Sequence, residues 1–272
     1  MNPSCPWPRF VFVLCCCLFV SACTCRTPAG QNLADGDVRA RLGNFTVAVS
    51  EGTAMQQPHV WYKNKDLAPA QEEVRTLSVT QSVRNFPLPE CESMKVEVFT
   101  GGANCCFGYY LLTRCPGDEY AAYVQPFDGG VGEPVGAMRA YPVNDPSFMY
   151  YAPKGQSGDK QLSFIRPESP RLTRYVVFEG NAWRADKPGE FTAAYKELAA
   201  KARADKDMNP SAKAITVAYY SMMAGGKKDV LKRRFQAALP KEYRNLADTI
   251  FTDIEKAVTG FAPVQNLDIA GR

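Results

Sequence analysis

The residue types that most often carry out chemistry are sparse in this chain, apart from cysteine. The single histidine, His59, lies in the segment QPHVW, and one histidine cannot build a multi-histidine metal site. A serine or cysteine triad centred on His59 remains open, although no Gly-x-Ser-x-Gly elbow appears. The sequence also lacks a Walker loop and a GxGxxG motif. We therefore predict no catalytic residue, no bound cofactor and no metal ligand.

Four cysteines lie within a window of 25 residues, at Cys91, Cys105, Cys106 and Cys115. In an oxidising compartment such a set is expected to form disulfides. Redox exchange or soft-metal binding is the alternative. Redox motifs usually place two residues between their cysteines, and a tetrahedral zinc site would require all four thiols to stay reduced. We favour structural disulfides.

The same window predicts a β-hairpin. Residues 94–99 alternate in polarity, residues 107–113 are aromatic and aliphatic, and turn residues lie between them. If the last residue of the first strand faces the first of the second, Cys91 lies opposite Cys115, within the span that a disulfide tolerates. We predict a Cys91–Cys115 bridge at the base of the hairpin.

The adjacent pair Cys105 and Cys106 is harder to assign. Neighbouring side chains point to opposite faces of a strand, so a vicinal bridge requires local strain. The alternative is that Cys91 pairs with one member and Cys115 with the other, because connectivity cannot be deduced from sequence. The run Gly-Gly-Ala-Asn-Cys-Cys at 101–106 resembles a Gly-Gly-Ala-His-Cys-Cys motif of secreted proteins of unknown function, with Asn104 in place of histidine.

The amino terminus is typical of an export signal. The segment FVFVLCCCLFV follows Arg9 and contains 11 residues without a polar side chain, too few for a spanning helix. The next residues, Val20-Ser21-Ala22-Cys23, resemble the lipobox of bacterial lipoproteins. That resemblance implies cleavage before Cys23 and diacylation of this cysteine, with palmitate among the possible acyl groups. Two acyl chains suffice for stable anchoring.

The resemblance also implies a place in the cell. Thr24 follows the lipidated cysteine where inner-membrane lipoproteins carry aspartate, which implies the outer membrane, facing the periplasm, in a cell with two membranes. We expect residues 1–22 to be a signal peptide and residues 23–37 to be a flexible tether, because the tether is polar, rich in Gly and Pro and without periodicity.

The remaining chain is long enough for a substantial core and is nearly neutral. Removing residues 1–22 leaves 250 residues, with 31 Lys plus Arg against 28 Asp plus Glu. A dedicated nucleic-acid binder should carry a dominant basic surface. We therefore expect no nucleic-acid partner.

Two structural regions are predicted. Strand patterns recur over residues 38–186, including 45–49 paired with 60–63, 119–127, 148–151, 161–165 and 174–178 followed by a Gly-Asn turn. Residues 187–260 show helical periodicity in about four segments, one of them starting at Asn209-Pro210. This composition predicts an α+β fold, with an antiparallel sandwich, barrel or propeller-like body, a helical segment and a tail at 261–272.

The helical region contains a basic cluster, formed by Lys227, Lys228, Lys232, Arg233 and Arg234. It could meet anionic headgroups or an acidic partner. Such clusters are more often a solvated helix face, and Asp229 within this one favours that interpretation.

Two hypotheses for function follow. The first is a non-catalytic envelope lipoprotein that binds or scaffolds, with an envelope protein or glycan as partner. The second is a lipid-anchored hydrolase. A deep pocket with several convergent acids or His59 favours the hydrolase, whereas a shallow aromatic patch favours the binding protein.

Overall fold

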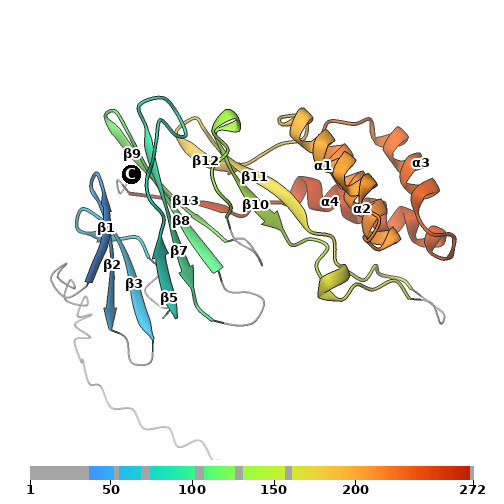
Figure 1. Cartoon of the computed structure of the whole chain (residues 1–272), viewed down its shortest axis with the longest axis horizontal. Helices are drawn as coiled ribbons and strands as arrows, with labels where there is room; N and C mark the ends of the chain where they lie inside the picture. Colours follow the sequence, from blue (N-terminus) through green and yellow to red (C-terminus); the bar gives the residue numbers. More distant parts are fainter. Residues whose placement is uncertain are drawn as a thin grey trace, which may run out of the picture. The chain divides into compact units, whose positions relative to one another are not determined.

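The computed structural model describes residues 37–51, 55–68, 74–101, 107–125, 131–156 and 161–269. The predicted signal peptide, the lipidation site Cys23, most of the tether and the pair Cys105 and Cys106 lie outside these residues. The predicted α+β class is confirmed, because three antiparallel sheets precede four α-helices, and the sheets do not close into a barrel (Figure 1).

The first sheet has the strand order β1-β2-β3-β4. Its strands are β1 (Asp37–Leu42), β2 (Phe45–Glu51), β3 (Gln56–Tyr62) and β4 (Lys65–Asp66). The predicted pairing of 45–49 with 60–63 is confirmed by the register Val47↔Val60. Gly43 has a φ of 56° in the turn between β1 and β2, a conformation that glycine adopts without strain.

The second sheet lies at the centre of the β-rich part. Its order is β13-β9-β8-β7-β5, with β6 also paired to β7. The strands are β5 (Thr76–Val79), β6 (Val83–Arg84), β7 (Glu92–Phe99), β8 (Phe107–Cys115), β9 (Asp118–Val124) and β13 (Val264–Leu267). β13 lies in the stretch that we expected to be a tail, and it pairs with β9 along the edge of the sheet.

The disulfide prediction is confirmed. β7 and β8 pair with Phe99 opposite Phe107, the register that the prediction assumed. Cys91 is bonded to Cys115, with their Cα atoms 4.2 Å apart. The hydrophobic alternation and the turn residues were therefore sufficient to place this bridge.

The third sheet has the order β10-β11-β12. Its strands are β10 (Ala140–Asp145), β11 (Leu172–Glu179) and β12 (Ala182–Ala185). The predicted Gly-Asn turn joins β11 to β12, and both Gly180 and Asn181 have positive φ angles. This is the backbone that two-residue hairpin turns require.

Two predicted strands are wrong. Residues 148–150 belong to a turn, residue 151 lies outside any helix or strand, and residues 161–165 form no strand. Phe148, Leu162 and Phe164 nevertheless belong to the buried core against the helices. The alternation of apolar and polar residues at 161–165 therefore indicated correctly that one side of this segment is buried. The segment is not a strand, because no neighbouring strand pairs with it.

Four α-helices follow the third sheet: α1 (Thr192–Ala204), α2 (Pro210–Met223), α3 (Lys228–Ala238) and α4 (Ala247–Gly260). Short 3-10 helices occupy Gly136–Met138, Arg166–Glu168 and Lys241–Leu246. The predicted start of α2 is confirmed, since the Asn209 side chain accepts a hydrogen bond of 2.9 Å from the Ser211 N–H. Among the described residues, no helix is both long and apolar enough to cross a membrane.

The central second sheet packs against the first sheet with one face and against the third sheet with the other. On β8, Tyr110 and Leu112 pack in a core with the first sheet, whereas Tyr109 and Leu111 pack in a core with the third sheet. The central sheet is therefore buried on both faces.

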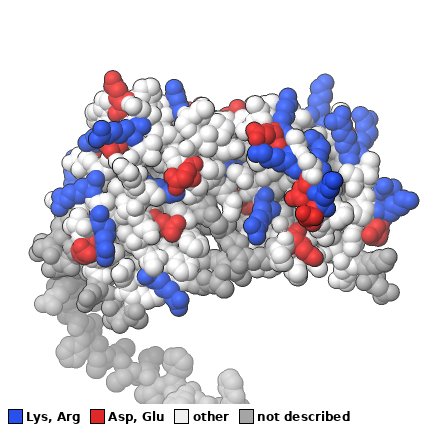
Figure 2. Space-filling model, viewed as in Figure 1, with Lys and Arg blue, Asp and Glu red and all other residues white. Residues whose placement is uncertain are grey.

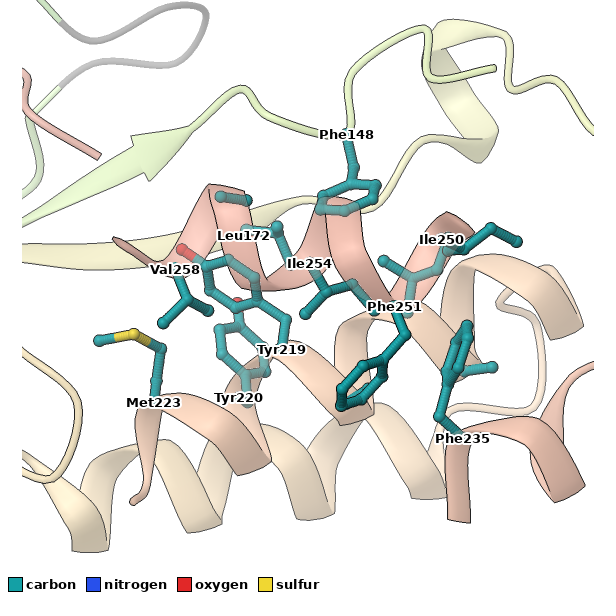
Figure 3. Close-up of a cluster of buried hydrophobic side chains, with 14 of the residues drawn as sticks. Phe148, Leu172, Tyr219, Tyr220, Met223, Phe235, Ile250, Phe251, Ile254 and Val258 are labelled. Atoms are coloured by element: carbon teal, nitrogen blue, oxygen red, sulfur yellow. The ribbon is translucent and has the colours of Figure 1, made fainter. Parts of the chain in front are cut away.

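The third sheet in turn packs on the helices. Tyr175 and Val177 of β11 join a core with all four helices, whose side chains include Tyr219, Phe251 and Ile254 (Figure 3). Residues 36–272 form one compact unit.

Candidate functional site

A cavity of about 810 Å³ opens among α1, α2 and α3. Its apolar floor consists of side chains that two helices direct inward, namely Ala214, Val217 and Ala218 of α2 with Leu231, Phe235 and Ala238 of α3. Leu231 and Phe235 are buried members of the helical core. The apolar residues that recur at helical spacing and form the core therefore also form the floor of the cavity.

Basic side chains line the same cavity. Arg203 comes from the last turn of α1, Lys206 from the connection to α2, Lys213 from α2 and Arg234 from α3. Asp207 is the one acidic side chain in the lining. In the view of Figure 2, Lys and Arg side chains gather over the helical part of the chain.

The positive charges of the cavity are largely uncompensated. Within the described part of the chain, Lys206, Lys213 and Arg234 form no ion pair with an acidic side chain. Arg203 donates a 3.3 Å hydrogen bond to the uncharged Ser221 Oγ. Four cations and one carboxylate around an apolar floor favour a ligand that combines an anionic group with an apolar part.

The predicted basic cluster is divided by the structure. Lys228 pairs with Glu255 at 2.5 Å and Lys232 pairs with Asp248 at 2.9 Å, both on the side of α4. Of the five predicted residues, only Arg234 lines the cavity. The cluster is thus mostly a charged helix surface, and Arg234 is its one member that faces the cavity.

A second cavity, of about 860 Å³, lies between the first two sheets, near Cys115. Its lining carries both signs of charge, including Lys63, Arg114 and Glu119, and contains no buried hydrophobic residue. It lacks the apolar floor and the charge excess of the helical cavity, and we do not assign it a ligand.

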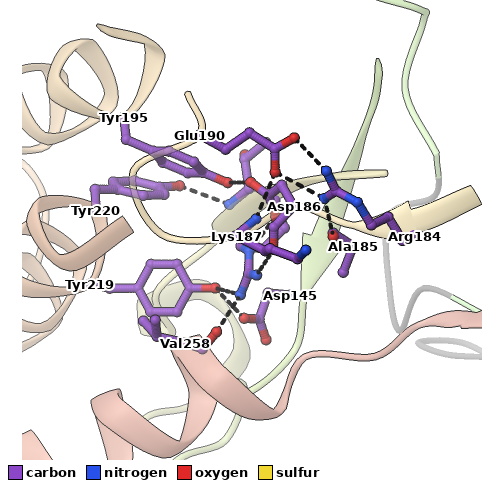
Figure 4. Close-up of polar contacts among 12 residues, drawn as sticks. Asp145, Arg184, Ala185, Asp186, Lys187, Glu190, Tyr195, Tyr219, Tyr220 and Val258 are labelled. Carbon is purple, nitrogen blue, oxygen red and sulfur yellow. Dashed lines mark hydrogen bonds and ion pairs between the residues drawn. The ribbon is translucent and has the colours of Figure 1, made fainter. Parts of the chain in front are cut away.

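A buried polar network joins the third sheet to the helices. Arg174 donates a 2.7 Å hydrogen bond to Asp186 and 3.2 Å hydrogen bonds to the Tyr219 hydroxyl and the Val258 carbonyl. Tyr195 donates to Asp186, and Tyr219 donates to Asp145 (Figure 4). The side chains of Arg174 and Asp186 are 1% and 0% exposed.

Perturbed pKa values mark this network, as they mark many active sites. Burial raises the pKa of Tyr195, and the charge of Asp186 raises it further. Burial also raises the pKa of Asp186, while Arg174 and Tyr195 partly offset that rise. No buried side-chain nitrogen or oxygen of the described residues lacks a hydrogen-bond partner. We assign the network a structural role, because its members are enclosed and fully paired.

The predicted site residues lie elsewhere. Cys91 and Cys115 close the hairpin in the second sheet, and neither lines the helical cavity. The described residues contain no group of three or more His, Cys, Asp or Glu side chains that could hold a metal ion.

Sequence reasoning missed Arg203, Lys206 and Lys213. A signal was present, because these cations flank the Asn209-Pro210 helix start, where the turn from α1 to α2 brings them together. What the sequence could not show is that Arg234, about 20 residues further on, faces the same space.

Comparison with known proteins does not add to this description. The sequence matches no protein-family model, and no curated protein or solved structure is significantly similar to it.

Proposed function

We propose that this protein is a bacterial lipoprotein, exported from the cytoplasm and held at a membrane by acyl chains on Cys23. This proposal is supported by the order of three features along the chain: an apolar run, then the small pair Ser21-Ala22, then the cysteine. The Cys91–Cys115 disulfide is consistent with it, because such bonds persist in oxidising compartments outside the cytoplasm. Thr24 favours the outer membrane, facing the periplasm.

The helical part of the body binds, without catalysis of its own, an anionic amphiphile, a small molecule with one acidic group and an apolar chain. The single observation that carries this proposal is the cavity of about 810 Å³ with basic side chains around an apolar floor. Ligand sites commonly have volumes of roughly 300 to 1,000 Å³ and combine apolar walls with a few placed polar groups.

The two halves of such a ligand contribute differently. Its chain gains roughly 25 cal/mol for each Å² of apolar surface removed from water at the Leu231 and Phe235 floor. Its acidic group pairs with Lys213 and Arg234, at roughly 1.5 to 3 kcal/mol for each hydrogen bond to a charged group. Charge therefore decides between an acid and the matching neutral alcohol.

Titration with decanoate and decanol tests the binding proposal. We use the full chain carrying Cys23→Ser, so that no detergent competes for the ligand. Decanoate is expected to bind at least about tenfold more tightly than decanol, and Lys213→Gln/Arg234→Gln is expected to remove that preference, because one lost ionic hydrogen bond is worth about a factor of ten.

The matched control is Lys196→Gln/Arg233→Gln, which removes two exposed helix cations that do not line the cavity. This variant should keep the preference for decanoate. Equal loss in both double variants would indicate a general charge effect and would contradict a specific site.

The cavity does not support the alternative hypothesis of a hydrolase. Its lining contains neither histidine nor cysteine, and its serine, Ser221, accepts a hydrogen bond from Arg203. The single histidine of the chain, His59, lies in the first sheet.

A further inference from the structure

A second group of residues, separate from the helical cavity, lies on one face of the first sheet. The Ser50 hydroxyl is 2.9 Å from Nε2 of His59, and Nδ1 of His59 is 2.7 Å from an oxygen of Asp66. The three residues come from three adjacent strands, β2, β3 and β4. A hydroxyl, an imidazole and a carboxylate are thus joined in series.

Strand register explains how the sequence brings them together. Ser50 pairs with Gln57, and Ala48 pairs with His59, so Ser50 and His59 are diagonal neighbours on one face. Trp61 lies two residues after His59 on that face and pairs with Asp66 of β4. Residues separated by nine and seven positions along the chain are therefore side by side in the sheet.

The carboxylate is held in place by the backbone. One Asp66 oxygen accepts hydrogen bonds from the Ala68 N–H at 2.9 Å and the Val60 N–H at 3.3 Å, while the other oxygen faces His59. The His59 ring is 5% exposed and stacks on Trp61 with a centroid distance of 5.8 Å. Both partners of the imidazole bond are thus fixed in orientation.

This arrangement sets the tautomer of the histidine. An ionised carboxylate can only accept hydrogen bonds, so the hydrogen must reside on Nδ1 of His59. The neutral ring then presents the lone pair of Nε2 to the Ser50 hydroxyl, which donates. This is the order of nucleophile, base and orienting acid by which such triads are recognised, whatever their position in the sequence.

We propose that Ser50 is a nucleophile activated by His59, and that the first sheet carries an esterase activity in addition to the binding function of the helices. Ser50 is partly exposed and lies next to the last residue of β2. His59 acts as the general base, and Asp66 is a positioning residue that holds the imidazole in the required tautomer.

The reaction conserves atoms and charge. Ser50 Oγ forms a bond to the ester carbonyl carbon while its proton passes to Nε2 of His59. The bond from that carbon to the alkoxy oxygen then breaks, and the leaving alcohol takes the proton from His59. Water attacks the acyl-serine by the same route, releasing the carboxylic acid and restoring Ser50.

Labelling with a fluorophosphonate probe tests the proposal without knowledge of the natural ester. The full chain, purified in neutral detergent, is expected to be modified once at Ser50, as located by peptide mass spectrometry. Ser50→Ala should abolish this label. Asp66→Asn should slow it by at least about a hundredfold, since it favours the wrong tautomer, and general-base assistance is worth roughly 10² to 10⁴.

The control is Ser78→Ala, which removes an exposed serine of β5 that has no histidine beside it. It should label like the unchanged protein. Absence of label at Ser50 in protein whose Cys91–Cys115 bond is intact would overturn the proposal, and so would equal labelling rates with and without Asp66.

A second measurement covers the case in which loss of Asp66 weakens the sheet. Ser50→Cys places a thiol beside His59 and leaves the other residues unchanged. Iodoacetamide should alkylate this cysteine at least about tenfold faster than the cysteine of Ser78→Cys, because the base increases the thiolate fraction. Equal alkylation rates in the two folded variants would contradict activation by His59.

Discussion

At the residue scale, this protein has two polar networks with different roles, one around Arg174 and Asp186 and one around Ser50. Arg174 and Asp186 are enclosed and form hydrogen bonds with each other and with Tyr195, Tyr219 and Val258, so they hold the third sheet and the helices together. Ser50 is partly exposed and its hydroxyl lies 2.9 Å from Nε2 of His59, a base that Asp66 holds in place, which is the geometry of a reactive group. We therefore assign the enclosed pair a structural role and the partly exposed Ser50 a chemical role.

The role of Arg174 is tested by Arg174→Leu. We expect the free energy of unfolding to fall by about 3 to 5 kcal/mol, because Asp186 stays buried without its cationic partner. Arg233→Leu, at an exposed position of α3, should change it by less than about 0.5 kcal/mol. Denaturant titration provides both values, and equal midpoints for the two variants would refute the assignment.

At the element scale, the periodicity of apolar residues predicted the features that involve a single strand pair or a single helix. The hairpin of β7 and β8, the Gly180-Asn181 turn and the Asn209 cap were all predicted because each rests on contacts close in sequence. β13 was not, since it pairs with β9 from about 140 residues further on.

The candidate sites show the same limit. Arg203 and Lys213 meet Arg234 only through helix packing, and Asp66 meets His59 only through the sheet register. A basic cluster and a lone histidine could be seen in the sequence, but their partners could not be selected from 32 basic and 28 acidic residues.

The hairpin disulfide provides a test at this scale. Cys91→Ala/Cys115→Ala should lower the free energy of unfolding by about 3 kcal/mol, as loop-closure entropy predicts for a separation of 24 residues. Denaturant titration measures this difference. Reduction of the unchanged protein should give the same loss, and a smaller loss in the double variant than on reduction would point to a second bond that contributes.

At the scale of the whole molecule, packed layers bury several tyrosines whose ionisation opposes folding. Burial raises the pKa of Tyr141 to about 12, and burial also raises the pKa of Tyr195 and Tyr219. A tyrosine with a higher pKa in the folded state binds its proton more tightly there. Its contribution is complete below about pH 10, the unfolded pKa, and is lost as the pH rises toward the folded pKa.

We therefore predict that stability decreases at alkaline pH. Each such tyrosine should lower the free energy of unfolding by up to about 1.4 kcal/mol per pH unit above pH 10. Urea titrations at pH 9 and pH 11 measure the decrease, and Tyr141→Phe should make it smaller by one such contribution. Equal unfolding free energies at the two pH values would contradict the buried, protonated state of these residues.

The proposed anchoring of the whole molecule rests on Cys23, and one measurement tests it most directly. Intact-mass spectrometry of the protein extracted from membranes should show a chain that begins at Cys23 and carries the mass of its acyl groups. Cys23→Ser should lack that mass and leave the membrane fraction. A wild-type chain that retains residues 1–22, or that begins elsewhere without acyl groups, would contradict the account.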